Sequence, residues 1–233
     1  MRFWQKRKSG FTLIELMISV ALMLVLVSSV VMVFNHTTTV FNVSEAKMSI
    51  YQNARAAMEI MAKELTSADN TPLTGYAGGD YDGFNVAYNG TVSAGGRFQF
   101  KSNTFWITGS SRQNGMAVVD YYLQNVPGYN VRNLMRRVRR ISITGSTTTL
   151  VEVSNSILAQ YVANDNTSFQ IDCFEYDAVG SQWKQYPTTT YPQTSPGDNK
   201  LPGAVRITIK FTDRESRIVR VLSRTVWIPK VSS

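Results

Sequence analysis

The sequence predicts an α+β protein in which one long N-terminal helix packs on an antiparallel β-sheet. Two observations carry this prediction. No glycine or proline occurs from Phe11 to Thr71, so nothing forces a break in a helix there. From Phe98 onward short apolar runs alternate with polar residues at the period of a half-buried strand. At 233 residues, the chain has room for one ordinary domain beside a membrane helix.

The start of the predicted helix is almost entirely apolar. Between Phe11 and Phe34 the residues that are not apolar are Thr12, Glu15, Ser19, Ser28 and Ser29. At about 1.5 Å per residue, this run would be roughly 36 Å long, enough to cross a bilayer core. The basic residues that precede it, with no acidic residue among them, are Arg2, Lys6, Arg7 and Lys8. This asymmetry places the N-terminus on the cytoplasmic side.

Two ordinary explanations of this run are a signal peptide and a plain anchor. A signal peptide has a shorter apolar stretch and a small-x-small cleavage site, and none follows Phe34. A plain anchor leaves Glu15 unexplained. A charge within a membrane span costs about 2.5–3.5 kcal/mol on insertion scales, so this carboxylate indicates a function and a partner.

The residues around Glu15 carry a resemblance to a known family. The run Gly10-Phe11-Thr12-Leu13-Ile14-Glu15, after a basic leader, resembles the processing site of type IV prepilins and type II secretion pseudopilins. The resemblance implies that a membrane aspartyl peptidase cleaves between Gly10 and Phe11 and methylates the new N-terminus at Phe11. It also implies that Glu15 pairs with an N-terminal amine, its own or that of a neighbouring subunit.

We therefore expect a pilin-like fold in four segments. Residues 1–10 form a cleaved leader, 11–34 a transmembrane and assembly helix, 35–71 its amphipathic continuation, and 72–233 a β-rich periplasmic head. In the continuation, one apolar stripe recurs at helical spacing: Val43, Ala46, Ile50, Ala54, Ala57, Met61, Leu65 and Ala68. We expect a sheet of the same chain to cover the stripe rather than a coiled-coil partner. The polar residues 35–39 are the expected place for fraying.

The head is predicted to consist of short strands. Phe98–Lys101 and Thr104–Thr108 flank Ser102-Asn103 as a predicted hairpin. The further predicted strands are Phe84–Tyr88, Ala117–Gln124, Thr149–Val153, Ile157–Val162, Ser168–Tyr176, Val205–Phe211 and Arg217–Ile228. Residues 52–65, and more loosely the order of motifs downstream, are similar to J-type pseudopilins and W-type minor pilins.

The composition argues against catalysis. One histidine (His36) and one cysteine (Cys173) provide neither a Ser-His-Asp constellation nor a zinc site, and the glycine-rich stretches lack phosphate-binding patterns. We predict no enzymatic activity, no cofactor and no metal. Asp80-Tyr81-Asp82-Gly83 matches only part of a calcium loop, so chance is the favoured explanation. We expect Cys173 to be a buried small hydrophobe.

The net charge of +8 falls to +4 without the basic residues before Phe11, so it is weak evidence for a nucleic-acid partner. The one notable charge run holds Arg136, Arg137, Arg139 and Arg140. We expect these side chains to be exposed and to face water and acidic neighbours. The alternative is a contact with DNA or another anionic partner, which stays open.

The sequence and the resemblance together predict a minor subunit that anchors in the inner membrane with its head in the periplasm. Its expected partners are the prepilin peptidase, other minor and major pilins or pseudopilins, and the inner membrane itself. It would assemble near the tip of a type II secretion pseudopilus or, alternatively, prime a type IV pilus for adhesion, motility or DNA uptake. An unrelated binding or enzyme domain on a plain anchor is a further alternative.

Overall fold

The structure is a computed structural model, and it describes residues 12–69, 71, 73–76, 78, 83–86, 97–177, 180–185, 201–213 and 218–229. The chain divides into two compact units. Met1–Ala46 is called the N-terminal unit below and Lys47–Ser233 the C-terminal unit, and each is described by itself. The fold is the predicted α+β type, with one long helix and an antiparallel sheet.

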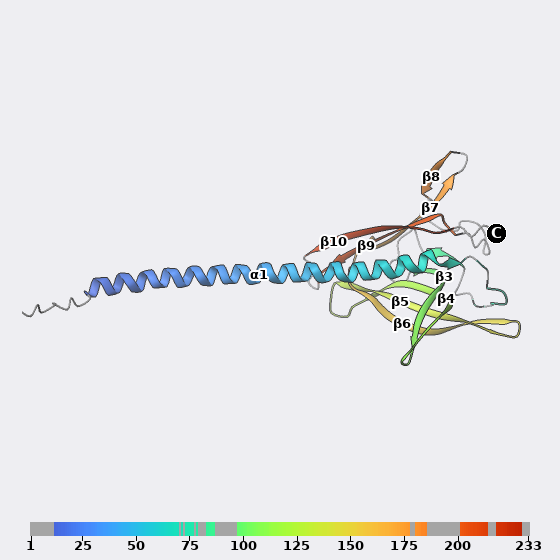
Figure 1. Ribbon diagram of the computed structural model, residues 1–233, viewed down its shortest axis with the longest axis horizontal. Helices are drawn as coiled ribbons and strands as arrows, with labels where there is room; N and C mark the ends of the chain where they lie inside the picture. Colours follow the sequence, from blue (N-terminus) through green and yellow to red (C-terminus); the bar gives the residue numbers. More distant parts are fainter. Residues whose placement is uncertain are drawn as a thin grey trace, which may run out of the picture. The chain divides into compact units, whose positions relative to one another are not determined.

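Helix α1 covers Leu13–Thr66 and so ends five residues before the predicted boundary at residue 71 (Figure 1). It is continuous through residues 35–39, where fraying was expected. The hydroxyls of Thr37, Thr38 and Thr39 donate to backbone carbonyls one turn earlier, at 2.6–2.9 Å. These bonds satisfy the threonines within the helix itself, so their low helix propensity does not interrupt it.

All the described strands belong to one antiparallel sheet. They are β1 (Ala68–Asp69), β2 (Asn85–Val86), β3 (Arg97–Thr108), β4 (Ser111–Asn125), β5 (Val131–Thr144), β6 (Thr147–Ala163), β7 (Phe169–Asp177), β8 (Gln182–Gln185), β9 (Ala204–Thr212) and β10 (Val219–Trp227).

The sheet has two parts. Strands β3 to β6 pair in chain order, and β1 and β2 pair with β3. The second part has the order β10-β9-β7-β8, and it joins the first at the single pair Val162 and Phe211. The C-terminal half of α1 runs between β9 and β10 on one side and β3 to β6 on the other (Figure 1).

The apolar stripe of α1 packs into the core of the C-terminal unit, as predicted. Its buried members are Ile50, Ala54, Ala57, Met61 and Leu65. They meet side chains from both parts of the sheet, among them Phe98 and Phe100 of β3, Tyr121 of β4 and Ile207 and Ile209 of β9. Covering the stripe by a sheet of the same chain is therefore confirmed.

The predicted hairpin at Ser102-Asn103 is wrong, because β3 is continuous from Arg97 to Thr108. Ser102 pairs with Ala68 and Ala117, and its hydroxyl donates to the carbonyl of Glu64 at 2.7 Å. The polar pair thus lies inside a strand that contacts the end of α1. The chain turns instead at Gly109, whose positive φ of 63° suits a tight turn.

Two further strand predictions need correction. Strand β5 was not predicted, because its run of arginines lacks the alternation of a half-buried strand. Thr149–Val153 and Ile157–Val162 form the single strand β6, which stays paired with β5 through several register shifts. The other predicted strands correspond to β2, β4, β7, β9 and β10 within a few residues, as far as the described ranges reach.

Candidate functional sites

Helix α1 begins with a bonded pair, Thr12 and Glu15. The Glu15 amide donates to the Thr12 carbonyl at 3.1 Å and to the Thr12 hydroxyl oxygen at 3.4 Å. The Thr12 hydroxyl donates to Glu15 Oε2 at 3.4 Å. This is close to a capping box, and the spacing Thr-x-x-Glu could have revealed it in the sequence. Glu15 also lies at the helix end where the macrodipole favours a negative charge.

The other residues of the predicted processing site lie outside the described residues. They are Gly10 and Phe11, together with the leader charges Arg2, Lys6, Arg7 and Lys8. Glu15 itself is exposed, and Thr12 is its side-chain partner among the described residues. Within the N-terminal unit, therefore, no cation of the described segment neutralises this carboxylate.

The N-terminal unit exposes a continuous apolar surface. Every large apolar side chain from Leu13 to Phe41 is at least half exposed. In the part of the chain that the structure describes, α1 is the one helix long and apolar enough to cross a membrane. A helix that is apolar on all sides needs lipid or other protein around it.

The end of α1 in the C-terminal unit carries a buried carboxylate, Glu64. Its oxygens accept hydrogen bonds from the Tyr121 and Thr104 hydroxyls and from the Arg136 guanidinium, whose Nε lies 3.0 Å away. Arg136 also donates to Thr104 Oγ1 at 2.8 Å and to the Phe105 carbonyl at 3.0 Å. Four residues from α1, β3, β4 and β5 are thereby tied together; we call them the Glu64 cluster.

The pKa values in this cluster follow from its burial and its charges. Burial, and then the neighbouring Glu64 carboxylate, raises the pKa of Tyr121 well above its ordinary value. Burial alone would lower the pKa of Arg136, but the hydrogen bond and charge of Glu64 outweigh burial and raise it. These shifts favour a neutral Tyr121 that donates its hydroxyl and a charged Arg136 beside Glu64.

A second buried carboxylate lies on the opposite face of the same strands. Asp120 is fully buried and accepts hydrogen bonds from Gln99 at 2.7 Å, Arg137 at 2.9 Å and Arg139 at 3.0 and 3.2 Å. The expected exposure of the arginine run is therefore wrong for Arg136 and Arg139, which are buried, and only partly right for Arg137. Arg140 is exposed.

These contacts explain why the arginines were misjudged. Alternate residues of β5 point to opposite faces, so Arg136 meets a carboxylate from α1 while Arg137 and Arg139 share one from β4. The sequence separations are 72, 17 and 19 residues. No local sequence pattern predicts ion pairs between residues so far apart. The four arginines therefore do not form one surface patch.

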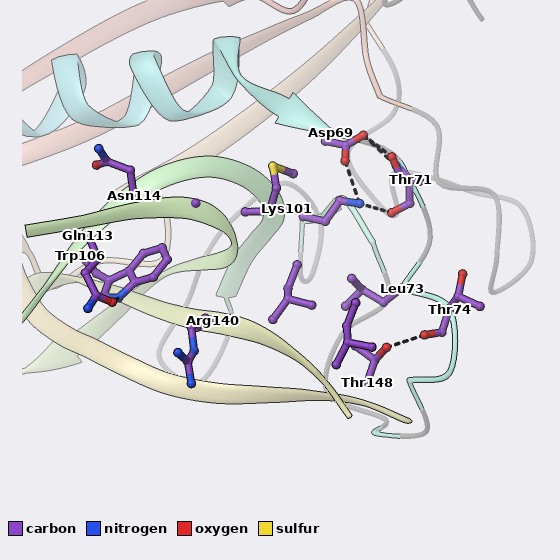
Figure 2. A pocket seen from close by; sticks show the side chains of 14 residues that line it. Asp69, Thr71, Leu73, Thr74, Lys101, Trp106, Gln113, Asn114, Arg140 and Thr148 are labelled. Carbon is purple, nitrogen blue, oxygen red and sulfur yellow. Dashed lines mark hydrogen bonds and ion pairs between the residues drawn. The ribbon is translucent and has the colours of Figure 1, made fainter. Parts of the chain in front are cut away.

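A cavity of about 880 Å³ in the C-terminal unit lies beside β3, β4 and β5 (Figure 2). At one end Lys101 Nζ pairs with Asp69 at 2.8 Å and donates to the Thr71 carbonyl. At another, Trp106 Nε1 donates to Gln113 at 3.2 Å. Thr148 fixes the loop above it by donating to the Thr74 carbonyl at 2.5 Å.

The described lining of this cavity is poor in the side chains that most often bind metals. Its described lining residues include no histidine or cysteine, and their one carboxylate is Asp69. Burial would raise the pKa of Asp69, but Lys101 and Thr71 outweigh it and lower that pKa. Asp69 is thus a weak base held in an ion pair.

The remaining metal and cysteine predictions have different outcomes. Within the described ranges, no group of three or more His, Cys, Asp or Glu side chains could hold a metal ion. Asp80 and Asp82 lie outside those ranges, so the calcium question stays as predicted. Cys173 is a free, buried thiol in the core, as expected, and its burial raises its pKa.

The fold and the N-terminal segment together define a class: an α+β protein with a membrane-capable helix that is apolar on all sides. A family model for the prokaryotic N-terminal methylation motif matches residues 5–31, which include Gly10, Phe11 and Glu15. This match supports a type IV prepilin-like N-terminal segment, and the apolar helix fits a membrane-anchored pilin or pseudopilin-like subunit. Such a motif implies interaction with the prepilin peptidase and with other pilins. No curated protein gives a significant match to the chain.

Proposed function

We propose that this protein is a minor pseudopilin that assembles at or near the tip of a periplasmic type II secretion pseudopilus. The observation that carries the proposal is the exposed, all-round apolar surface of the N-terminal unit with one carboxylate at its start. Lipid covers such a surface before assembly, and the same segments of neighbouring subunits cover it afterwards. The size of the C-terminal unit, Lys47–Ser233, suits a tip subunit better than a small repeated one.

Processing is the first step of the proposed mechanism. The peptidase removes residues 1–10 by cleaving between Gly10 and Phe11, and Phe11 becomes the methylated N-terminus. Before cleavage, Arg2, Lys6, Arg7 and Lys8 hold the N-terminus on the cytoplasmic side. In this scheme residues 11–34 span the membrane, residues 35–71 continue the helix, and the β-rich head from residue 72 lies in the periplasm.

Glu15 sets the register in which subunits dock. An unpaired carboxylate surrounded by apolar helices is costly, so the favoured register brings Glu15 to the N-terminal amine of an adjacent subunit. The Thr12 bond is long, at 3.4 Å, and an amine would replace it readily.

Mass spectrometry of the native N-terminus tests the proposal. A mature chain that begins at N-methylated Phe11 supports it. An unprocessed N-terminus, or replacement of Gly10 that leaves mass and location unchanged, would favour a binding or enzyme domain on a plain anchor.

The assembly step is tested separately with Glu15→Ala. We expect this variant to insert and be processed but to assemble poorly, whereas Glu45→Ala, another exposed glutamate of α1, should assemble normally. Normal fibres from the Glu15 variant would remove the register argument.

The second candidate is a minor pilin that primes a type IV pilus. It is supported by the same motif, which both kinds of subunit carry. Neighbouring genes distinguish the two: a secretin and a secretion ATPase with other pseudopilins, or a cluster of minor pilins. DNA uptake gains no support from the arginine run, because Arg136 and Arg139 are buried.

A further inference from the structure

Strand β10 forms an open edge of the sheet. It pairs with β9 along its whole length, from Val219 opposite Thr212 to Trp227 opposite Ala204, without a register shift. Among the described strands β9 is its one partner. Seven of its nine residues are exposed, including Val219, Val221 and Trp227. A regular edge strand of this length presents a row of backbone N–H and C=O groups that can pair with another strand.

A groove lies beside the C-terminal end of this strand. It holds about 420 Å³ and is lined by Glu59, Ala62, Lys63 and Thr66 of α1 and by the consecutive residues Arg224, Thr225, Val226 and Trp227 of β10. Successive side chains of a strand point to opposite faces. Because four consecutive residues of β10 line this groove, it opens at the edge of the strand. Residues of α1 form its other wall.

The charges beside the groove are mostly positive. Arg220 and Arg224 are exposed, and neither has a carboxylate partner within the described ranges. Lys63 adds a third exposed cation from α1, while the one acid of the lining, Glu59, pairs with Arg55 at 3.5 Å. An incoming strand with acidic side chains would complement this edge.

The same charges disfavour a second copy of this chain as the partner. If two β10 strands paired antiparallel about Leu222, Arg220 of each copy would lie opposite Arg224 of the other. Like charges directly opposite one another in a sheet are destabilising. This register is therefore disfavoured for a second copy, whereas an acidic strand would meet both arginines favourably.

The two faces of β10 specify the partner further. Arg220, Leu222 and Arg224 share one face, and Val219 and Val221 lie on the other. At the far end, Trp227 contacts Trp183 edge to face, with ring centroids 4.9 Å apart, and both rings are about half exposed. They provide an aromatic contact for an apolar side chain.

We propose that β10 is a docking strand for an extended, acidic segment of another polypeptide, which adds to the sheet edge in the groove beside α1. The partner places acidic residues opposite Arg220 and Arg224 and apolar or β-branched residues on the other face. Backbone pairing supplies the affinity and the arginines supply the selectivity. This site does not depend on the proposed function, since it is built within the C-terminal unit.

Binding to synthetic peptides tests the docking strand. The probe is a fluorescent nine-residue peptide with valine or threonine at the odd positions and at position 2, glutamate at positions 4 and 8, and leucine at position 6. In antiparallel pairing the two glutamates lie opposite Arg224 and Arg220. It is titrated against the full chain in neutral detergent. We expect saturable binding that weakens with salt, falls at least tenfold when lysine replaces glutamate, and disappears when alternate backbone nitrogens are methylated.

Matched variants locate the binding surface. Arg220→Glu with Arg224→Glu should lower affinity for the acidic peptide at least tenfold and let the lysine peptide bind. Arg112→Glu with Arg140→Glu makes the same change in net charge on exposed arginines of β4 and β5, and it should leave affinity unchanged. Near-ultraviolet circular dichroism checks that each variant is folded, and Arg220→Gln with Arg224→Gln provides a milder replacement.

Several results would overturn the proposal. They are no binding at millimolar peptide, equal binding of the methylated peptide, or equal losses in the two double variants. Self-association of the chain that the β10 variant abolishes would identify a second copy as the occupant instead.

Discussion

Glu15 and Glu64 lie near opposite ends of helix α1, and they differ in burial and in the number of their hydrogen-bond partners. Glu64 is buried and accepts hydrogen bonds from Tyr121, Thr104 and Arg136. Glu15 is exposed and bonded, weakly, only to Thr12 among the described side chains. One carboxylate has several partners from distant strands, and the other has one described side-chain partner, three residues away.

The difference teaches how to separate residues that hold a fold from residues that build an assembly. Both are acids of the same helix α1. A buried carboxylate whose oxygens accept hydrogen bonds from the same chain is of the kind that holds a fold. An exposed carboxylate on an apolar surface, which lipid or another protein must cover, is of the kind expected in an assembly. We expect the stability lost on replacing each carboxylate to increase with the number of hydrogen bonds and ion pairs that the rest of the chain makes to it.

Glu64→Gln should have the largest effect on stability. It leaves the buried Arg136 guanidinium without its counter-charge, which costs about 3–5 kcal/mol when one member of a buried pair is removed. Thermal unfolding of the full chain in detergent, followed by near-ultraviolet circular dichroism, measures the loss. Glu59→Gln breaks the exposed pair with Arg55 and should change stability by about 0.5 kcal/mol or less.

A double variant shows whether charge or shape causes that loss. Glu64→Gln with Arg136→Met removes both charges, and we expect it to be more stable than Glu64→Gln alone. If the double variant were less stable than the single one, the unpaired charge would not be the cause.

Asp120→Asn should have the next largest effect. The amide keeps a partner for Gln99 but removes the charge that Arg137 and Arg139 share. Hydrogen bonds to charged groups contribute about 1.5–3 kcal/mol, and Arg137 is partly exposed, so we expect a loss in that range. The same unfolding experiment measures it. An unchanged midpoint would mean that water replaces the carboxylate at both arginines.

Asp165 should contribute a small, pH-dependent amount. Burial would raise its pKa, but hydrogen bonds from Thr167 and the charge of Lys210 outweigh burial and lower it. Since the folded-state pKa lies below the unfolded one, the contribution is complete above the ordinary pKa of 3.8 and is lost as pH falls through the folded value. Asp165→Asn should therefore cost about 0.5 kcal/mol or less at pH 7, and less still at pH 2. A difference that grows toward low pH would reverse the assigned sign.

Glu15→Ala should have the smallest effect on unfolding of the C-terminal unit. Glu15 has no described contact there, so the near-ultraviolet transition should stay within about 0.5 kcal/mol of the parent chain. A clear shift of that transition would show that Glu15 has a partner inside the fold after all, and the contrast with Glu64 would fail.

The sequence predicted those parts of the fold whose determinants are local. The helix followed from sixty residues without glycine or proline, and β9 from the alternation of Val205, Ile207, Ile209 and Phe211 with polar residues. Strand β5 escaped prediction because Arg136, Arg137 and Arg139 become acceptable in a sheet only when Glu64 and Asp120 arrive from distant segments. The Thr12–Glu15 capping pair was readable from its spacing and was missed.

The serines of the apolar segment have a further consequence. Ser19, Ser28 and Ser29 each donate their hydroxyl to a carbonyl of their own helix, at 2.7–2.8 Å. From Leu13 to Phe34 no hydroxyl donor is therefore left for a neighbour, and Glu15 carries the one charge of this stretch. In the proposed assembly, such a helix would slide or rotate against lipid or another helix at little cost, and the charge of Glu15 would then select its final position.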